Sequence, residues 1–202
     1  AGALSGAMEV SHLTFGYRNE GVTVLRDVSF SIRAGECVAI VGRSGCGKST
    51  LMRLLLGFET PQQGAVYYDG QELASLDVAS VRCQMGVVLQ NGQLMSGDIF
   101  TNIVGTSTLT MEDAWLAAER VGIAEDIREM PMGMHTMISE GSNNISGGQR
   151  QRLLLARAIA NQPTIMILDE ATSALDNRTQ AIVTKSLQAM RCTRIIVAHR
   201  LT

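Results

Sequence analysis

The sequence has no excess of basic residues and no long apolar run. Its 202 residues carry 17 Lys and Arg against 19 Asp and Glu, and this net charge of −2 gives no basic footprint for a nucleic acid. No apolar run approaches the roughly 20 residues that a membrane-spanning helix needs, so we expect this domain itself to be soluble. Hydrophobic residues still make up 46% of the chain, enough for one substantial core.

Paired cysteines and a signal peptide are also missing. Cys37, Cys46, Cys83 and Cys192 form no C-x-x-C pair and have no metal-ligand spacing with the histidines. We therefore expect free thiols, buried or half-buried, in a reducing compartment. Residues 1–7 are small and lack the charged start of a signal peptide, and we expect them to be a linker or a cloning remnant.

What the sequence does contain is a phosphate-binding motif. Residues 42–50 read GRSGCGKST and match G-x-x-x-x-G-K-[ST]. The apolar run 38–41 before the motif predicts a buried strand and the run 51–56 after it a helix, which is the context that the motif requires. Gly45 and Gly47 allow backbone N–H groups to close around phosphate oxygens at the positive end of that helix. A chance Gly-rich turn is the alternative, and the flanking pattern argues against it.

Three side chains of this motif have expected roles. We expect Lys48 to reach the β- and γ-phosphates, Ser49 to give a hydroxyl to Mg²⁺, and Thr50 to place a second hydroxyl near the phosphates. The nucleotide-binding loop also contains three variable positions to whose side chains we assign no chemistry: Arg43, Ser44 and Cys46.

The rest of the chain predicts an α/β fold around this loop. The sequence predicts strands at 8–15 and 25–32, which would form an N-terminal antiparallel β subdomain. It also predicts a strand at 65–68, followed by the turn Asp69-Gly70. Residues from about 94 to 160 predict an inserted α-helical subdomain whose methionines pack in a core. Three residues are expected to begin helices: Thr110, Ser146 and Asp176.

Polar groups follow four apolar runs that predict parallel strands buried on both faces. They are the phosphate loop after Val41, Gln90 after Leu89, Asp169 and Glu170 after Leu168, and His199 after Ala198. Ligands bind at the carboxyl ends of such strands, so these groups should converge in a phosphate-loop (P-loop) NTPase core with a mostly parallel sheet.

The expected chemistry at these strand ends is phosphoryl transfer. We expect Asp169 to hold Mg²⁺ through water and Glu170 to act as the general base for the attacking water. Gln90 would sense Mg²⁺ and that water, and His199 would bond the γ-phosphate. A lone strand-end His is more often a satisfied polar residue and an Asp-Glu pair a solvated helix start, but convergence with Lys48 favours the chemical roles.

Two further motifs, ISGGQRQR at 145–152 and ILDEATSALD at 167–176, resemble the nucleotide-binding domain of ATP-binding-cassette (ABC) transporters. The resemblance runs from about Glu9 to the end of the chain, with every motif in order. It implies the ABC ATPase fold, with Gln90 in the Q-loop, His199 as the switch histidine and Asp176 in the D-loop. The implied signature motif that binds nucleotide is Ser146, Gly147, Gly148 and Gln149.

The resemblance also bears on Tyr17, which lies between the first two predicted strands. By itself Tyr17 is either a partly exposed turn residue or an aromatic face for a purine ring. In the family the aromatic residue at this place stacks on adenine, so the resemblance implies the second role for Tyr17.

The same resemblance implies partners. In this family the signature motif closes over the nucleotide held by a second nucleotide-binding domain, so two ATP molecules with Mg²⁺ are sandwiched head to tail. Because Glu170, His199 and the signature motif are intact, the resemblance implies a homodimer with two equivalent hydrolytic sites. It further implies a transmembrane domain, fused or separate, at the cytoplasmic face of the cell (inner) membrane, and no nucleic acid.

Two segments resemble the exporter branch of the family: residues 94–103, and residues 133–141 with Glu140. A peptide or bacteriocin is one common cargo of that branch. The departures are Ile145 in place of the commoner Leu and the end of the chain soon after His199. We therefore expect residues 8–202 to be a nucleotide-binding domain truncated at its C-terminus.

Two alternative functions stay open from the sequence. An ABC-type ATPase that clamps nucleic acid or ribosomes predicts coiled-coil insertions, a duplicated cassette or basic arms, and the sequence contains none of them. A plain phosphate-loop kinase needs an acceptor site and has no use for residues 146–149.

Overall fold

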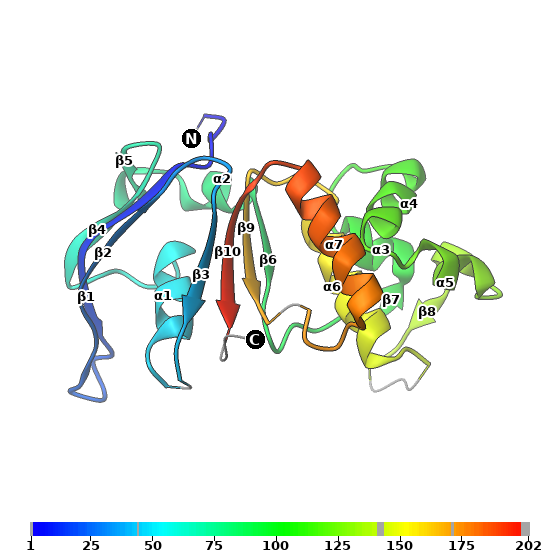
Figure 1. The fold of residues 1–202 in the computed structure, drawn as a ribbon, viewed down its shortest axis with the longest axis horizontal. Helices are drawn as coiled ribbons and strands as arrows, with labels where there is room; N and C mark the ends of the chain where they lie inside the picture. Colours follow the sequence, from blue (N-terminus) through cyan, green and yellow to red (C-terminus); the bar gives the residue numbers. More distant parts are fainter. Residues whose placement is uncertain (1, 44, 141–143, 171, 199–202) are drawn as a thin grey trace. The chain divides into compact units, whose positions relative to one another are not determined.

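The structure is a computed structural model that describes residues 2–43, 45–140, 144–170 and 172–198 (Figure 1). Its described residues divide into two compact units. The first takes the chain up to Met85, then Thr164–Leu168 and the described residues from Cys192 on, and the second takes Gly86–Pro163 and Asp169–Arg191. The domain boundaries that the sequence predicts, 8–202 with a helical part near 94–160, stay predictions.

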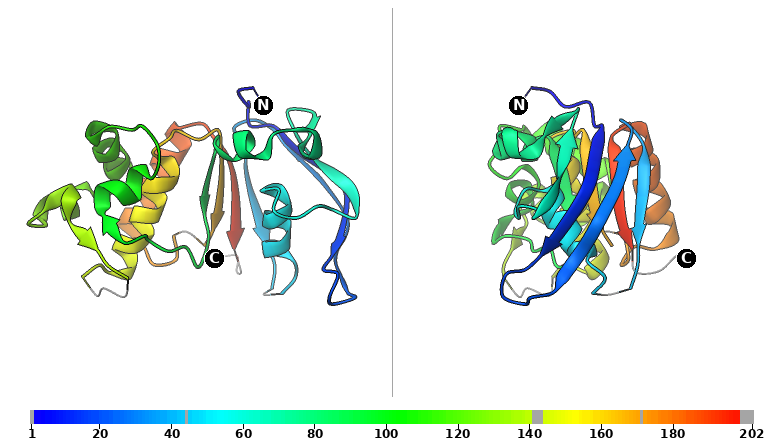
Figure 2. Two further views of the ribbon diagram at one scale, coloured as in Figure 1. Left: turned by 180° about the vertical axis from the view of Figure 1, so that it is seen from behind. Right: turned by 90° about the vertical axis from the view of Figure 1, so that its left-hand side faces the viewer.

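An antiparallel sheet forms one part of the first unit. Its strand order is β2-β1-β4-β5. The opposite directions of β1 and β2 are visible in the right-hand view of Figure 2. The strands are β1 (Met8–Gly16), β2 (Thr23–Ile32), β4 (Gln63–Tyr68) and β5 (Gln71–Glu72). The turn at Asp69-Gly70 joins β4 to β5, as the sequence predicts, because both residues adopt the positive φ that such a tight turn needs.

Parallel strands form the other part of the first unit. β10 (Thr193–Ala198) lies between β3 (Cys37–Val41) and β9 (Ile165–Asp169), and β10 pairs with β3 in parallel. Figure 1 shows α1 (Lys48–Leu55) between β3 and the antiparallel sheet. The buried Tyr68 hydroxyl of β4 donates a hydrogen bond to the Leu55 carbonyl of α1. This helix is therefore bonded to the antiparallel sheet as well as following β3.

The predicted burial of the parallel strands is right for β9 and wrong for β3. Every residue of β9 is buried. Along β3 alternate residues are exposed, and Val41 at its end is 40% exposed. β3 stands at one end of its sheet order, so among the described strands it has a hydrogen-bonded neighbour on one side only. Apolar composition identified the strand but did not show that one of its faces is uncovered.

Helices dominate the second unit. They are α3 (Ile99–Val104), α4 (Met111–Arg120), α5 (Ala124–Glu129), α6 (Gly147–Ile159) and α7 (Asn177–Ala189). α6 packs against both α3 and α4, and Leu153 and Leu155 on α6 are fully buried.

The elements of the two units that have not been named so far are short. They are η1 (Leu73–Ser75), α2 (Val78–Arg82), β6 (Met85–Val88), the pair β7 (Gly97–Asp98) and β8 (Met137–Ile138), and η2 (Gly133–His135).

The three predicted helix starts are confirmed by side-chain caps. Thr110 and Ser146 each form a reciprocal capping box with the residue three positions later. Asp176 accepts a hydrogen bond from the Thr179 N–H at 2.7 Å and begins α7. Each cap gives a partner to an N–H group that the helix itself leaves without one.

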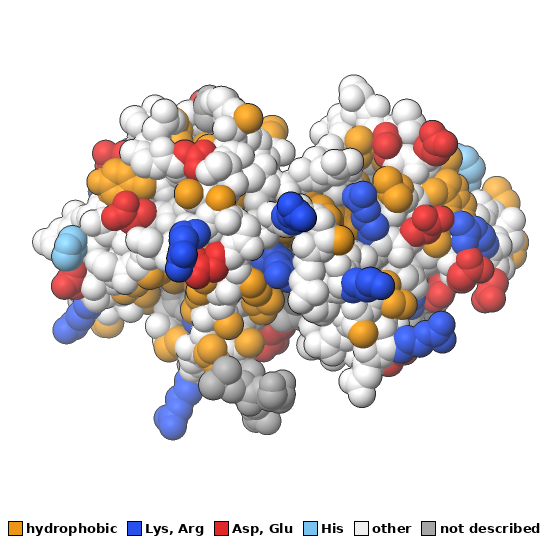
Figure 3. Space-filling model, turned by 45° about the horizontal axis from the view of Figure 1, so that its top comes forward, with side chains coloured by type: hydrophobic (Ala, Val, Ile, Leu, Met, Phe, Trp, Pro, Cys, Tyr) orange, Lys and Arg blue, Asp and Glu red, His pale blue; other side chains and the backbone are white. Residues whose placement is uncertain are grey.

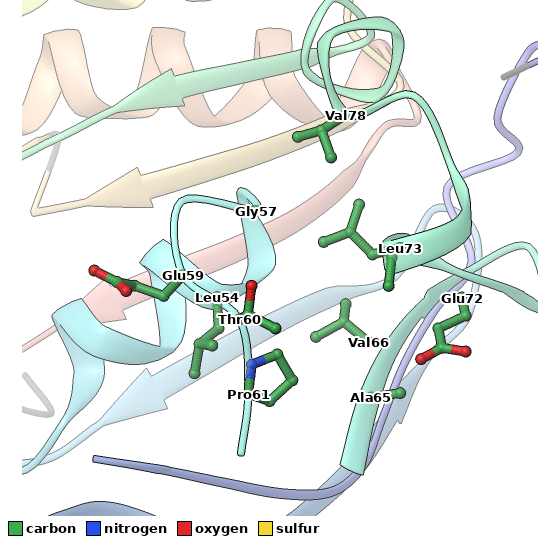
Figure 4. A pocket seen from close by; sticks show the side chains of 11 residues that line it. Leu54, Gly57, Glu59, Thr60, Pro61, Ala65, Val66, Glu72, Leu73 and Val78 are labelled. Atoms are coloured by element: carbon green, nitrogen blue, oxygen red, sulfur yellow. The ribbon is translucent and has the colours of Figure 1, made fainter. Parts of the chain in front are cut away.

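A small apolar cavity of ≈ 100 Å³ lies within the first unit. Figure 4 shows Leu54, Val66, Leu73 and Val78 around it, next to the turn at Gly57. Gly57 has φ +75°, and a Cβ atom there would lie 2.7 Å from Val78 Cγ1, so this turn requires glycine.

On the surface that Figure 3 displays, Lys and Arg side chains are interspersed with Asp and Glu. Among the described helices, none combines the length and the apolar character needed to cross a membrane.

Candidate functional site

The phosphate loop leads from β3 directly into α1. Gly45 has φ +82° and Gly47 has φ +98°, so both occupy the left-handed region that glycine adopts without strain. A Cβ atom on Gly47 would lie 2.9 Å from Leu25 Cδ2 and 3.1 Å from Val24 Cγ1, so a larger residue would push the loop off β2. The first turn of α1 contains no acidic residue. The helix therefore presents its N–H groups and positive end to an incoming anion.

The three side chains with expected roles lie in the first turn of α1. The Lys48 side chain is buried, with 7% of the residue exposed, and its ammonium donates a hydrogen bond to the Gly42 carbonyl. Ser49 is exposed, whereas Thr50 is buried. Ser44 lies outside the described residues. The Lys48 ammonium thus contacts the residue at the start of the motif, and Ser49 is accessible to a ligand.

Tyr17 lies beside this loop. Its hydroxyl is 3.2 Å from the Thr50 hydroxyl, and its ring meets the Phe15 ring edge to face, with centroids 5.0 Å apart. The residue is half-buried. The structure therefore connects Tyr17 with the phosphate loop, which the sequence spacing alone left open, and its stacking on adenine stays a prediction.

Carboxylate and amide groups meet in the second unit. Asp169, the last residue of β9, is 7% exposed, and Glu170 follows it with φ +50°, an uncommon value for a residue with a side chain. Gln90 follows β6, and its Nε2 donates a hydrogen bond to Glu170 Oε2 at 3.0 Å. The predicted convergence of Gln90 with Glu170 is therefore present, although 80 positions separate them in the chain.

The fourth predicted strand-end residue, His199, lies outside the described residues. The strand before it is described: Ala198 of β10 pairs with Val41 of β3, in the last register position before the phosphate loop.

The segment around Ser146 forms a second helix N-terminus that is suited to binding an anion. The Gln149 N–H donates to Ser146 Oγ at 3.1 Å, and the Ser146 N–H donates to Gln149 Oε1 at 3.0 Å. Because Ser146 Oγ accepts within the cap, its own O–H remains able to donate to a ligand. Ser146 and Gly147 are exposed, and the first turn of α6 contains no acidic residue.

Gly148 has a packing reason to be glycine. A Cβ atom there would lie 3.2 Å from the Ala174 carbonyl, so the small residue allows the segment 172–176 to approach α6. At the end of that segment the Asp176 carboxylate caps α7. Its pKa is lowered by the backbone and side-chain hydrogen bonds from Thr179. The predicted contact of Asp176 with nucleotide therefore has to coexist with this cap.

Two side chains that the sequence analysis passed over organise this region. Gln151 on α6 bonds the backbone of Glu170 and of Ala174. Asp126 on α5 accepts hydrogen bonds from Gln149 Nε2 at 3.1 Å and from an Arg152 terminal nitrogen at 3.0 Å. The spacing of Gln149 and Arg152 by three helical positions could have indicated a shared partner on their face of α6. It could not have named Asp126.

The cysteines differ from expectation. The thiols are free, but Cys37, Cys46 and Cys83 are exposed, and Cys192 is the buried one. Cys37 and Cys46 lie on the uncovered strand β3 and in the phosphate loop, so neither packs into a core. Burial raises the pKa of the Cys192 thiol.

A family model described as ABC transporter matches residues 25–173, which include the phosphate loop, Glu170 and the segment around Ser146. The chain belongs to the ABC transporter family. The fold and family that the motifs predict are confirmed, and with them the expectation of an ATPase domain of this family. The individual residue roles stay predictions.

Several members of the family resemble this chain over nearly its whole length. An ABC transporter ATP-binding protein of Bacillus subtilis (strain 168), YwjA, is 43% identical over 98% of this chain and 35% of its own length. The exotoxin translocation ATP-binding protein PaxB of Pasteurella aerogenes is 42% identical, over 98% of this chain and 28% of its own. The present chain therefore spans about a third or less of these curated relatives.

A solved structure supports the same family assignment. The structure of a bacterial Atm1-family ABC exporter with ATP bound superposes with a TM-score of 0.92 at 36% identity, and covers 97% of this chain and 35% of that one. The ABC ATPase fold, with its parallel and antiparallel sheets and its helical part, is thus shared by both.

Proposed function

We propose that this chain binds and hydrolyses ATP with Mg²⁺, and that two copies close head to tail over two ATP molecules. The observation that carries the two-copy arrangement is the start of α6. Gly147 is exposed there, and apart from its chain neighbours and the backbone of α6, no described residue lies within 4 Å of where its Cβ atom would be. Packing within the described chain therefore does not explain a glycine at the first position of α6. Close approach of the partner's nucleotide to the start of α6 would explain the glycine at this position.

Mg²⁺ fits the residues that we assign to it. Among the described side chains no group of three His, Cys, Asp or Glu could hold a metal ion. Mg²⁺ bound with a nucleotide needs no such group, because phosphate oxygens and water supply most of its ligands. The Ser49 hydroxyl and the Asp169 carboxylate are hard oxygen donors that would hold the ion, which when bound offsets the negative charge of the phosphates.

The proposed reaction needs one base and several charge-stabilising groups. Glu170 takes a proton from water, the water oxygen bonds to the γ-phosphorus, and the bond from that phosphorus to the β–γ bridging oxygen breaks. ADP and inorganic phosphate are released. The Gln90 amide bonded to Glu170 Oε2 orients the base, and Lys48 offsets charge on the phosphates. A well-placed base accelerates such a step by about 10²–10⁴-fold.

We further propose that this hydrolysis drives an exporter. PaxB is named for exotoxin translocation and the solved neighbour is an exporter, which supports an export function. The implied partners are a second copy of this chain and a transmembrane domain, fused or separate, at the cytoplasmic face of the membrane. The same relatives disfavour a clamp on nucleic acid or ribosomes. Loss of the γ-phosphates would release the two copies and so switch the attached membrane domain.

The test uses Glu170→Gln, which keeps the size of the side chain and removes the base. This variant should bind ATP, lose hydrolysis and accumulate as an ATP-dependent dimer in size-exclusion chromatography with light scattering. The control is Glu170→Gln combined with Lys48→Ala, which should stay monomeric because the phosphate contact is gone. Lys48→Ala alone should abolish hydrolysis.

Two results would count against the proposal. Normal turnover by Glu170→Gln would remove Glu170 from the mechanism. A Glu170→Gln protein that binds ATP and Mg²⁺ but remains monomeric, also in the intact protein, would exclude the sandwich.

A further inference from the structure

One side-chain amide links α6 to the backbone of the proposed base. The Gln151 Nε2 donates a hydrogen bond to the Glu170 carbonyl at 3.1 Å and lies 3.4 Å from Ser173 Oγ. The Gln151 Oε1 accepts a hydrogen bond from the Ala174 N–H at 2.9 Å. A single half-buried side chain thus holds the segment after β9 at both of its ends.

The backbone of Glu170 is in a conformation that needs such support. With φ +50°, Glu170 occupies the left-handed region, where the Cβ atom of an L-residue is crowded by the backbone. This φ value sets the direction in which the side chain leaves the chain, and hence where its carboxylate lies. Residues in such conformations persist only where their surroundings hold them.

The carboxylate itself is held by a different element. Gln90 donates to Glu170 Oε2 at 3.0 Å, while Gln151 acts on the carbonyl of the same residue. The two amides therefore have separate roles, because one orients the carboxylate and the other holds the backbone that carries it. Gln151 is on the same helix as Ser146, which begins α6.

We propose that Gln151 is a positioning residue that holds Glu170 in its left-handed conformation and couples it to the start of α6. This inference rests on the proposed function, in which Glu170 is the base and Ser146 meets the partner's nucleotide. A helix moves as a rigid element, so a displacement of α6 when Ser146 is engaged moves the Gln151 amide and with it the Glu170 carbonyl. Hydrolysis at one nucleotide then depends on capture of the other.

Gln151→Glu separates the two contacts of the side chain. The glutamate keeps the length and an oxygen for the Ala174 N–H, but it has no N–H to donate to the Glu170 carbonyl. Gln151→Leu removes both contacts. The control is Gln188→Leu, which makes the same chemical change at an exposed position of α7.

In the intact protein, we expect both Gln151 variants to lower kcat about 10–100-fold, which is no more than the loss of a general base would cost, because the base is misplaced and not removed. KM for ATP should change less than twofold, because the phosphate loop is unaltered, and Gln188→Leu should match the wild type in both constants. Thermal melting identifies a variant that is simply unfolded; Gln151→Glu, which retains the Ala174 contact, then carries the test.

A double-variant comparison distinguishes positioning from general support of the fold. Added to Glu170→Gln, the change Gln151→Leu should cause no further loss of the residual hydrolysis, because there is no longer a base to position. A further loss of tenfold or more would overturn the inference.

The inference and the proposed function fail in different ways. If Glu170→Gln is inactive but Gln151→Glu hydrolyses ATP at the wild-type rate, the role of Gln151 is refuted and the proposed function stands. If Glu170→Gln hydrolyses ATP normally, the proposed function is refuted, and the role of Gln151 with it.

Discussion

At the scale of single residues, the candidate site depends on positions where the backbone or a neighbour leaves little choice. Gly47 is held against Leu25 and Val24, and Gly148 allows the Ala174 carbonyl to approach. These glycines are explained by contacts within the chain. Gly147 differs, because an added Cβ atom there would meet open space, and we propose that the partner's nucleotide approaches it.

The exposed thiol of Cys46 gives a probe of the phosphate loop. We expect MgATP to slow the modification of Cys46 by N-ethylmaleimide at least about tenfold, because the bound phosphates cover the loop. Exposed Cys83 is the matched control and should react at the same rate with and without nucleotide. Cys192 should react slowest, because it is buried and burial raises its pKa, so little of it is the reactive thiolate.

Peptide mass spectrometry after timed labelling measures all of these rates in one sample. Equal labelling of Cys46 with and without MgATP, in a protein that hydrolyses ATP, would show that the nucleotide does not cover this loop.

At the scale of elements, α6 connects the functional groups of the second unit. Its first turn carries Ser146 and Gln149, its next residues carry Gln151 and Arg152, and its buried face packs in the helical core. Arg152 is bonded to the Gly122 carbonyl at 2.7 Å and to the Asp126 carboxylate, and its side chain is only 13% exposed. Asp126 on α5 thereby holds the start of α6 from outside the helix.

We expect Asp126→Ala to lower the free energy of unfolding by about 1–3 kcal/mol, because the largely buried Arg152 and the Gln149 amide both lose an acceptor. The adjacent Glu125 is the matched control. It is 79% exposed and paired with Arg128, so Glu125→Ala should cost less than about 1 kcal/mol. Urea denaturation followed by circular dichroism measures both. Equal losses for the two variants would show that the Asp126 contacts do not stabilise the protein.

At the scale of the whole molecule, the candidate site residues divide between the two compact units. Tyr17 and the phosphate loop belong to the first, whereas Gln90, Glu170 and the start of α6 belong to the second. The proposed reaction therefore draws its groups from both units, and the proposed dimer adds a second chain. Stability of the whole chain in turn limits the conditions under which that assembly can form.

Part of the pH dependence of stability should come from Asp98, whose carboxylate caps α3 by accepting a hydrogen bond from the Thr101 N–H. Burial alone would raise the pKa of Asp98, but hydrogen bonds from Thr101 and the interaction with His135 outweigh it, so the pKa is lowered. A folded-state pKa below the unfolded value of about 3.9 means that the unfolded chain binds more protons between the two values. The stabilising contribution is therefore present above about pH 4 and is lost as pH falls through the folded-state pKa.

Urea midpoints measured from pH 6 down to pH 3 should fall for the wild type. The decrease should be smaller for Asp98→Asn, which has no carboxylate at this position to protonate. An identical decrease in both proteins would assign the acid sensitivity to other groups.

Local interactions account for what could be predicted from the sequence. A phosphate loop, a capping box or an Asp cap joins residues a few positions apart, so Gly42–Thr50, Ser146 and Asp176 were identified from their spacing. Apolar runs likewise predicted β3, β9 and β10, and polar residues at strand ends predicted that Gln90 would meet Glu170. Family resemblance then assigned roles that spacing left open, such as that of Tyr17.

Tertiary structure decided the rest, because those contacts join positions with no shared pattern along the chain. Gln151 on α6 meets Glu170 after β9, and Gln149 on α6 meets Asp126 on α5, only because the chain folds these distant segments against one another. The burial of β3 and of the cysteines also depended on which faces other elements cover, and composition does not contain that information. The sequence by itself therefore determined the fold, the phosphate loop and the helix caps, while packing between distant segments determined how the proposed base is held.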